Sequence, residues 1–141
     1  KSKLPEIILK SLNIDPIETY KSRDYLLLYD NENQIRNIKV KKEFLDQINL
    51  GCGGVIVTSK GKNCDFVSRY FTPQSSILED PVTGSSHCTL TPFWSKRLNK
   101  KSLSADQLSK RGGSLQCLDK GSRVIVSGQA KTFSKTTFVL K

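Results

Sequence analysis

The chain has 141 residues and a formal net charge of +10, with 26% charged residues. This length fits one domain of ~100–150 residues, so we expect a single domain over residues 1–141. The many short runs of Val, Ile, Leu and Phe exclude an intrinsically disordered chain. No apolar stretch approaches the ~20 residues that cross a bilayer, and no signal peptide opens the sequence. We therefore expect no membrane partner and a cytoplasmic location.

The start of the sequence is unusual. The chain begins at Lys1 and contains no Met, although a translation product begins with Met. We interpret the chain as part of a longer polypeptide, and the sequence leaves open whether the shortening is natural, proteolytic or engineered.

Cysteine spacing argues against a metal centre. The four cysteines, Cys52, Cys64, Cys88 and Cys117, form no CxxC pair, and His87 is the only histidine. Zinc ligands typically come in close pairs. We expect reduced thiols, no disulfide framework and no metal.

The charge is concentrated in the second half. Residues 1–50 carry nine basic and eight acidic side chains, whereas residues 86–141 carry eleven basic and two acidic ones. A basic half can bind nucleic acid. The lysines are scattered, however, and few aromatic residues lie between them to stack on bases. We therefore expect no nucleic-acid partner, although nucleic-acid binding is kept as a third hypothesis.

The first half predicts short helices around a hairpin. Pro5 and Glu6 suit the first turn of a helix over residues 4–13, which Asp15-Pro16 ends. An apolar run predicts a strand over 25–29, and alternation predicts a second hairpin strand over 34–40. An amphipathic pattern predicts a helix over 41–50.

The second half predicts mostly strands. They are expected over 55–59 and 65–71, followed by a loop over 72–83 and the longest helix over 84–98. Five short strands follow, over 104–109, 114–118, 123–127, 129–133 and 137–140, with glycine-rich turns between several of them. Many strands around few helices indicate an α+β fold rather than alternating βαβ units.

The segment from Glu79 to His87, EDPVTGSSH, has the features of a ligand site. A carboxylate pair precedes a helix, and Gly84 lets a ligand approach because it has no Cβ. The free N–H groups of Gly84, Ser85 and Ser86 at the helix end suit a carboxylate or a phosphate.

A purely structural interpretation of the same segment remains open. Asp80, Thr83 or Ser85 could simply cap the helix. Glu79 could be solvated or could pair with Arg69, and His87 could pack in the core. The spacing alone names no reaction.

Several motifs together resemble the PhzF family, the phenazine-biosynthesis-like proteins. They are, in order, DFVSRYF at 65–71, the EDPVTGSSH segment, the LSKRGG turn at 108–113 and the RV…SGQA segment at 123–130. The match covers roughly residues 23–133.

The resemblance implies the fold of diaminopimelate epimerase. Such proteins have two similar α+β domains, each with a mixed or antiparallel sheet curled around a central helix, and the active site lies between them. This chain matches only the C-terminal domain. Its central helix starts near Gly84, and Pro92 is expected to kink it. Cys88 is interpreted as a core residue of that helix.

The resemblance also implies an activity. Family members isomerise a small carboxylate-bearing substrate without a cofactor, and a Glu of the first domain moves the proton. That Glu is expected upstream of Lys1, so the isolated chain is expected to be inactive. Asp80 is the candidate catalytic residue, and Gly84, Ser85 and Ser86 are the candidate substrate-binding residues. The expected partner is the N-terminal domain or a second copy in a homodimer. The rival hypothesis is a catalytically incomplete fragment that acts as a protein-binding or dimerisation module.

Overall fold

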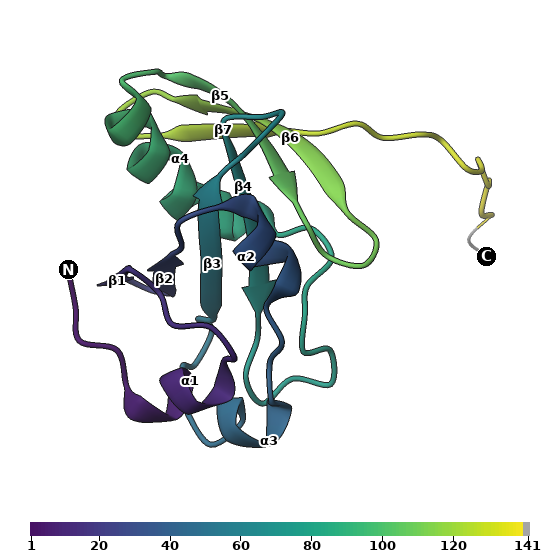
Figure 1. Cartoon of the computed structure of the whole chain (residues 1–141). Helices are drawn as coiled ribbons and strands as arrows, with labels where there is room; N and C mark the ends of the chain where they lie inside the picture. The colour runs from purple at the N-terminus through teal and green to yellow at the C-terminus, as the bar shows by residue number, and fades with distance from the viewer. Residues whose placement is uncertain (140–141) are drawn as a thin grey trace.

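The computed structural model describes residues 1–139, and within them the chain forms four helices and one seven-stranded sheet (Figure 1). The strands lie side by side in their order along the chain. They are β1 (Glu18–Lys21), β2 (Tyr25–Leu28), β3 (Val55–Lys60), β4 (Phe66–Phe71), β5 (Ser102–Gln107), β6 (Gly113–Asp119) and β7 (Val124–Ser127). The helices are α1 (Glu6–Ser11), α2 (Glu32–Asn37), α3 (Lys42–Leu45) and α4 (Gly84–Leu98).

The sheet is mixed. β2 pairs with β3 and β4 pairs with β5 in parallel, and the other neighbours are antiparallel. Parallel neighbours need a crossover connection, and helices supply it here: α2 and α3 between β2 and β3, and α4 between β4 and β5. The predicted α+β class with a mixed sheet is confirmed.

Both faces of the central strands are covered. Leu27, Val57 and Val67 belong to a core cluster shared with α1, α2 and α3, whereas Leu26 and Ile56 belong to a cluster shared with α4. Successive strand residues point to opposite faces, so a strand buried on both sides is apolar throughout. This explains why β2 and the first half of β3, residues 55–57, have continuous apolar sequences.

Helix α4 is fixed against the sheet by its buried face. The Trp94 ring stacks on Phe66 with 5.9 Å between ring centroids. The Trp94 indole N–H donates to Thr58 Oγ1 at 3.0 Å, and the Thr58 hydroxyl donates to the Val67 carbonyl at 2.7 Å. A buried indole N–H is costly without a partner, so this pair orients the helix as well as stabilising it. The predicted central helix is confirmed over residues 84–98, and it runs continuously through the exposed Pro92.

Two sequence predictions in the first half are wrong. Residues 32–37 form α2 instead of a strand, because the Asn31 side chain accepts a hydrogen bond from the Gln34 N–H and caps the helix. The hairpin partner of β2 is β1, for which the sequence analysis predicted no strand. Helix α3 is also shorter than the predicted 41–50.

Three predictions in the second half are wrong as well. Residues 128–139 are exposed and form neither helix nor strand, so the predicted strand at 129–133 is absent. Residues 137–139 likewise form no strand, and Leu140 lies outside the described part. This segment leads away from the body of the domain (Figure 1). Cys88 is exposed rather than part of the core, because it lies on the face of α4 that does not meet the sheet.

In the part of the chain that the structure describes, no helix combines the length and apolarity needed to span a membrane.

His87 packs in the core, as the structural interpretation predicted. Its side chain is fully buried, and its Nδ1 lies 2.7 Å from the Thr83 carbonyl oxygen. A carbonyl can only accept, so Nδ1 carries the hydrogen. Nε2 has no partner within residues 1–139. Burial lowers the pKa of His87, and the hydrogen bond to Thr83 opposes this only in part.

This arrangement predicts acid sensitivity. The folded state resists protonation of His87, so the unfolded state binds the extra proton first as the pH falls below about 6.5. The free energy of unfolding should then fall by up to ~1.4 kcal/mol per pH unit. Urea unfolding between pH 7.5 and pH 5 measures this slope. His87→Asn keeps an N–H donor for Thr83 but does not titrate, and it should flatten the slope. An equal slope in both proteins would contradict the assignment.

Candidate active site at the N-terminus of helix α4

The N-terminal end of α4 is open to solvent. Gly84 and Ser85 are exposed, and a Cβ placed on Gly84 would meet no heavy atom within 4 Å. Within residues 1–139, the backbone N–H groups of Gly84, Ser85 and Ser86 donate no hydrogen bond to any group outside the helix. The first N–H groups of a helix lack intrahelical partners and carry a partial positive charge. The end of α4 can therefore accept a carboxylate.

The hydroxyl groups around this end have different orientations. Thr83 is the N-cap residue, but its side chain makes no capping hydrogen bond. The Ser86 side chain is buried and donates to the Thr83 carbonyl at 2.9 Å, so its hydroxyl is already engaged. The Ser85 hydroxyl instead faces Arg23. Side-chain capping by Thr83 was therefore a wrong prediction.

Asp80 lies in the loop that leads into α4. Its backbone N–H donates to the Tyr70 carbonyl at 3.1 Å, and its Oδ1 accepts from the Val82 N–H at 3.3 Å. The other carboxylate oxygen, Oδ2, has no hydrogen-bond partner among the described residues. Asp80 thus presents an acceptor from a loop fixed by its backbone.

Glu79, its neighbour, has a structural role. Its carboxylate pairs with Arg69 through two hydrogen bonds of 2.7 and 3.0 Å. Arg69 also donates to the carbonyls of Ile35 and Ile38 at the end of α2. The interpretation of Glu79 as a partner for Arg69 is confirmed, which separates the roles of the two adjacent carboxylates.

Gln107, at the end of β5, holds both ends of the Asp80–Thr83 loop. Its buried side chain accepts from the Thr83 N–H at 2.8 Å and donates to the Asp80 carbonyl at 2.7 Å. Ser109 donates to the Pro81 carbonyl between them, also at 2.7 Å. Sequence reasoning missed Gln107, since a glutamine at the end of a strand carries no distinguishing pattern.

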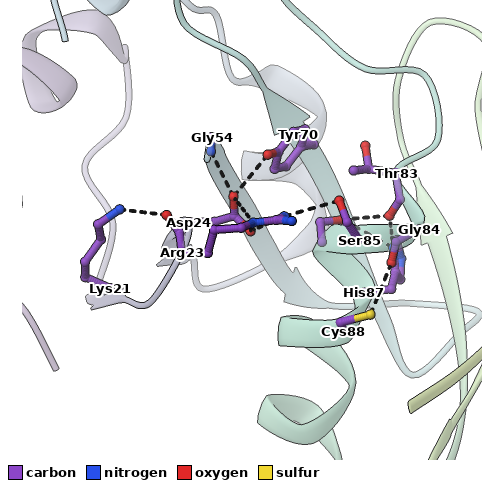
Figure 2. Close-up of polar contacts among 11 residues, drawn as sticks. Lys21, Arg23, Asp24, Gly54, Tyr70, Thr83, Gly84, Ser85, His87 and Cys88 are labelled. Atoms are coloured by element: carbon purple, nitrogen blue, oxygen red, sulfur yellow. Dashed lines mark hydrogen bonds and ion pairs between the residues drawn. The ribbon is translucent and has the colours of Figure 1, made fainter. Parts of the chain in front are cut away.

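Arg23 and Asp24 form the other side of the site (Figure 2). The Asp24 side chain is fully buried and pairs with the Arg23 guanidinium at 2.7 Å. Asp24 also accepts from the Gly54 N–H at 2.8 Å and from the Tyr70 hydroxyl at 3.0 Å. Arg23 Nη2 donates in turn to Ser85 Oγ at 3.2 Å. Sequence reasoning missed this pair too, because 62 positions separate Arg23 from Ser85.

Tyr70 stays protonated in this environment. Burial, reinforced by the negative charge of Asp24 and by the hydrogen bond to it, raises the pKa of Tyr70 to about 12. The negative charge of Asp80 adds a smaller contribution in the same direction. Tyr70 is therefore a hydrogen-bond donor to Asp24 at physiological pH and not a base.

The glycine-rich turn that leads into β6, whose first residue is Gly113, packs against the same loop. A Cβ on Gly113 would lie 2.4 Å from Val82 Cγ2, so only glycine permits this approach. An open groove of about 610 Å³ lies beside the contact and is lined by Val82, by residues 111–116 and by residues 127–129. The turn and the Asp80 loop thus form one wall of a concave surface. Within residues 1–139, no three His, Cys, Asp or Glu side chains gather closely enough to hold a metal ion.

The hydrogen bonds of Gln107 predict that its replacement lowers the free energy of unfolding. Gln107→Met keeps the volume but leaves the Thr83 N–H and the Asp80 carbonyl without partners, so it should lower the free energy of unfolding by ~1–3 kcal/mol. Gln116→Met, at an exposed position of β6, is the matched control and should change little. Urea unfolding measures both variants. An equal effect in both would show that Gln107 does not hold the loop.

The close contact between Gly113 and Val82 predicts that a second substitution can restore stability. Gly113→Ala should destabilise the domain by ~1–3 kcal/mol, because the new methyl group overlaps Val82. The double variant Gly113→Ala/Val82→Ala should recover part of this loss by removing the overlapping atoms. Gly128→Ala is the control, since its Cβ would come no closer than 3.9 Å to any atom beyond its chain neighbours, the nearest being the Ser114 carbonyl oxygen. Thermal unfolding of the unaltered protein, the single variant Val82→Ala and these three variants tests this prediction. A loss in the double variant equal to the sum of the two single losses would contradict it.

Comparison with known proteins identifies the family. The family model described as phenazine biosynthesis-like protein matches residues 6–136. An uncharacterized isomerase of Pseudomonas aeruginosa is 41% identical over 136 residues, which are 96% of this chain and 52% of that protein. The chain thus spans about half the length of the curated relatives that it matches.

Solved structures agree with the sequence match. The crystal structure of a PhzF-family protein of Enterococcus faecalis superposes with a TM-score of 0.87 at 42% identity, covering 94% of this chain and 51% of that one. A putative phenazine biosynthesis PhzC/PhzF protein of Clostridium difficile gives the same TM-score at 41% identity, covering 99% and 53%. With a family model that matches nearly all of its length, this chain belongs to the PhzF family of phenazine biosynthesis-like proteins.

Proposed function

We propose that this chain is the substrate-orienting half of an isomerase that moves a proton between two carbons of a small carboxylate-bearing metabolite, without a cofactor. The observation that carries the proposal is the open N-terminus of α4 beside the Asp80 loop, in a chain of the PhzF family. The name "isomerase" given to the Pseudomonas aeruginosa relative supports the reaction class.

In this proposal, the residues at the start of α4 bind the substrate carboxylate and Asp80 orients the substrate. The substrate carboxylate accepts hydrogen bonds from the N–H groups of Gly84 and Ser85, where the helix dipole stabilises its charge. The hydroxyl of Ser85 adds a donor, and Ser86 contributes its backbone N–H. Asp80 binds a polar group of the substrate and assists proton transfer, because it presents a carboxylate oxygen at a fixed position.

The proton itself needs a second catalytic group. One carbon loses a proton to a base, the double bond shifts along the substrate, and the same base returns the proton to another carbon. In this proposal the base is the Glu that the family resemblance places in the first domain. Because this chain spans about half of its relatives, the complete reaction is proposed for the two-domain assembly, with the first domain as the partner.

The role of Asp80 is tested in that assembly. This chain is combined with a separately expressed first domain and a panel of small unsaturated carboxylic acids in D₂O, and proton NMR follows isomerisation. Asp80→Asn should lower the rate by ~10²–10⁴-fold, the usual contribution of a positioned acid or base.

Glu79→Gln is the matched control because it alters the adjacent carboxylate, which pairs with Arg69. Its rate should stay within a few-fold of the unaltered protein. Full activity of Asp80→Asn would rule out the role assigned to Asp80. If the unaltered assembly converts none of the acids, the proposed substrate class is wrong.

A further inference from the structure

The guanidinium of Arg23 lies beside the open end of α4 and retains unused donors. Its Nε and Nη2 face Asp24, and Nη2 also reaches Ser85 Oγ at 3.2 Å. No hydrogen bond of Nη1 occurs within residues 1–139, and 41% of the side chain is exposed to solvent. A positive charge with free N–H groups is thus held next to the helix end.

The position of Arg23 is imposed from the core. Its partner Asp24 is fully buried and is also fixed by the Gly54 N–H and the Tyr70 hydroxyl (Figure 2). The backbone packs closely here, since a Cβ on Gly54 would lie 2.6 Å from the Tyr70 ring. A carboxylate with this many donors cannot rotate freely, and it sets the direction of the guanidinium that it binds.

The contact with Arg23 also determines which hydrogen-bonding role is left to the Ser85 hydroxyl. A hydroxyl has one hydrogen to donate. Because Ser85 Oγ accepts from Arg23, its own O–H is left to donate elsewhere, and no acceptor for it is found in the described residues. An oxygen atom bound at the end of α4 would therefore meet the backbone N–H groups, the Ser85 O–H and the guanidinium charge together.

We propose that Arg23, held in place by Asp24, is the residue that makes this site select a carboxylate over its neutral amide. This inference rests on the proposed function, because it concerns the same anion site. The backbone N–H groups bind any acceptor oxygen, whereas a fixed guanidinium favours a charged one, and charge-assisted hydrogen bonds are roughly twice as strong as neutral ones. Arg23 is thus a specificity-determining residue, and Asp24 is its positioning residue.

The test compares benzoate with benzamide, which differ mainly in charge. Each is titrated into the ¹⁵N-labelled chain, and the amide signals of Gly84, Ser85 and Ser86 report binding. Benzoate should shift these signals and bind more tightly than benzamide. Arg23→Gln should lower the affinity for benzoate ~10-fold, as expected for loss of one charge-assisted hydrogen bond. The affinity for benzamide should stay unchanged.

Two further variants separate specificity from folding. Arg23→Gln leaves Asp24 buried without its ion-pair partner, so Arg23→Gln/Asp24→Asn removes both charges and should give the same loss for benzoate. Arg36→Gln is the matched control: Arg36 also pairs with a buried carboxylate, Glu32, at 2.6 Å, but does so within α2. It should leave both affinities unchanged.

The outcomes distinguish this inference from the proposed function. If Arg23→Gln binds benzoate at Gly84 and Ser85 as tightly as the unaltered chain does, the inference is overturned. The proposed anion site would then still hold. A parallel loss of benzoate and benzamide would overturn it too, because it would show a merely structural effect. Absence of benzoate binding to the unaltered chain would overturn the anion site and, with it, this inference.

Discussion

The buried Asp24 carboxylate is the interaction on which the arrangement of the site depends. A charge removed from water is costly unless it is paired and hydrogen-bonded, and Asp24 meets this requirement with donors from separate parts of the sheet. Arg23 comes from the turn between β1 and β2, Gly54 directly precedes β3, and Tyr70 lies on β4. Satisfying one carboxylate therefore ties the ends of three neighbouring strands together.

The same network reaches the proposed ligand site through Arg23. Its guanidinium extends from the sheet to Ser85, so the first turn of α4 is placed relative to β1 and β2 by a polar contact. On the other side, Gln107 fixes the loop that carries Asp80 to the end of β5. The helix end and the Asp80 loop are thus held from two directions: by Arg23, which pairs with the buried Asp24, and by the buried Gln107. Hydrogen-bonding groups that are already fixed in place need no rearrangement to stabilise the charge that develops during a reaction. Such preorganisation suits the proposed isomerase.

The packing of α4 explains how an exposed site is compatible with a buried helix. Leu90, Trp94 and His87 lie against the sheet, whereas Gly84, Ser85 and Cys88 face outward. The buried face supplies the apolar area that fixes the helix, and the small residues at its start keep the N–H groups accessible. The concave surface beside the turn at 111–113 is lined by residues of β6 and β7 and touches the Asp80–Thr83 loop through Val82.

Features that are encoded by local chemistry could be predicted from the amino-acid sequence. The residues predicted the long helix α4 over 84–98, a β-branched run predicted β3, and the returning segment after the turn at 60–63 predicted β4. The same local evidence misled at 34–40, where alternation suggested a strand although Asn31, three residues before Gln34, was an available helix-capping signal. At 129–133 strand propensity was present, but a strand needs a neighbour to pair with, and residues 128–139 have none in the described structure. Only the tertiary structure joined Arg23, Asp24 and Gln107 to the motif at 80–86, because a buried charge or amide is satisfied by partners tens of residues away, which no local pattern records.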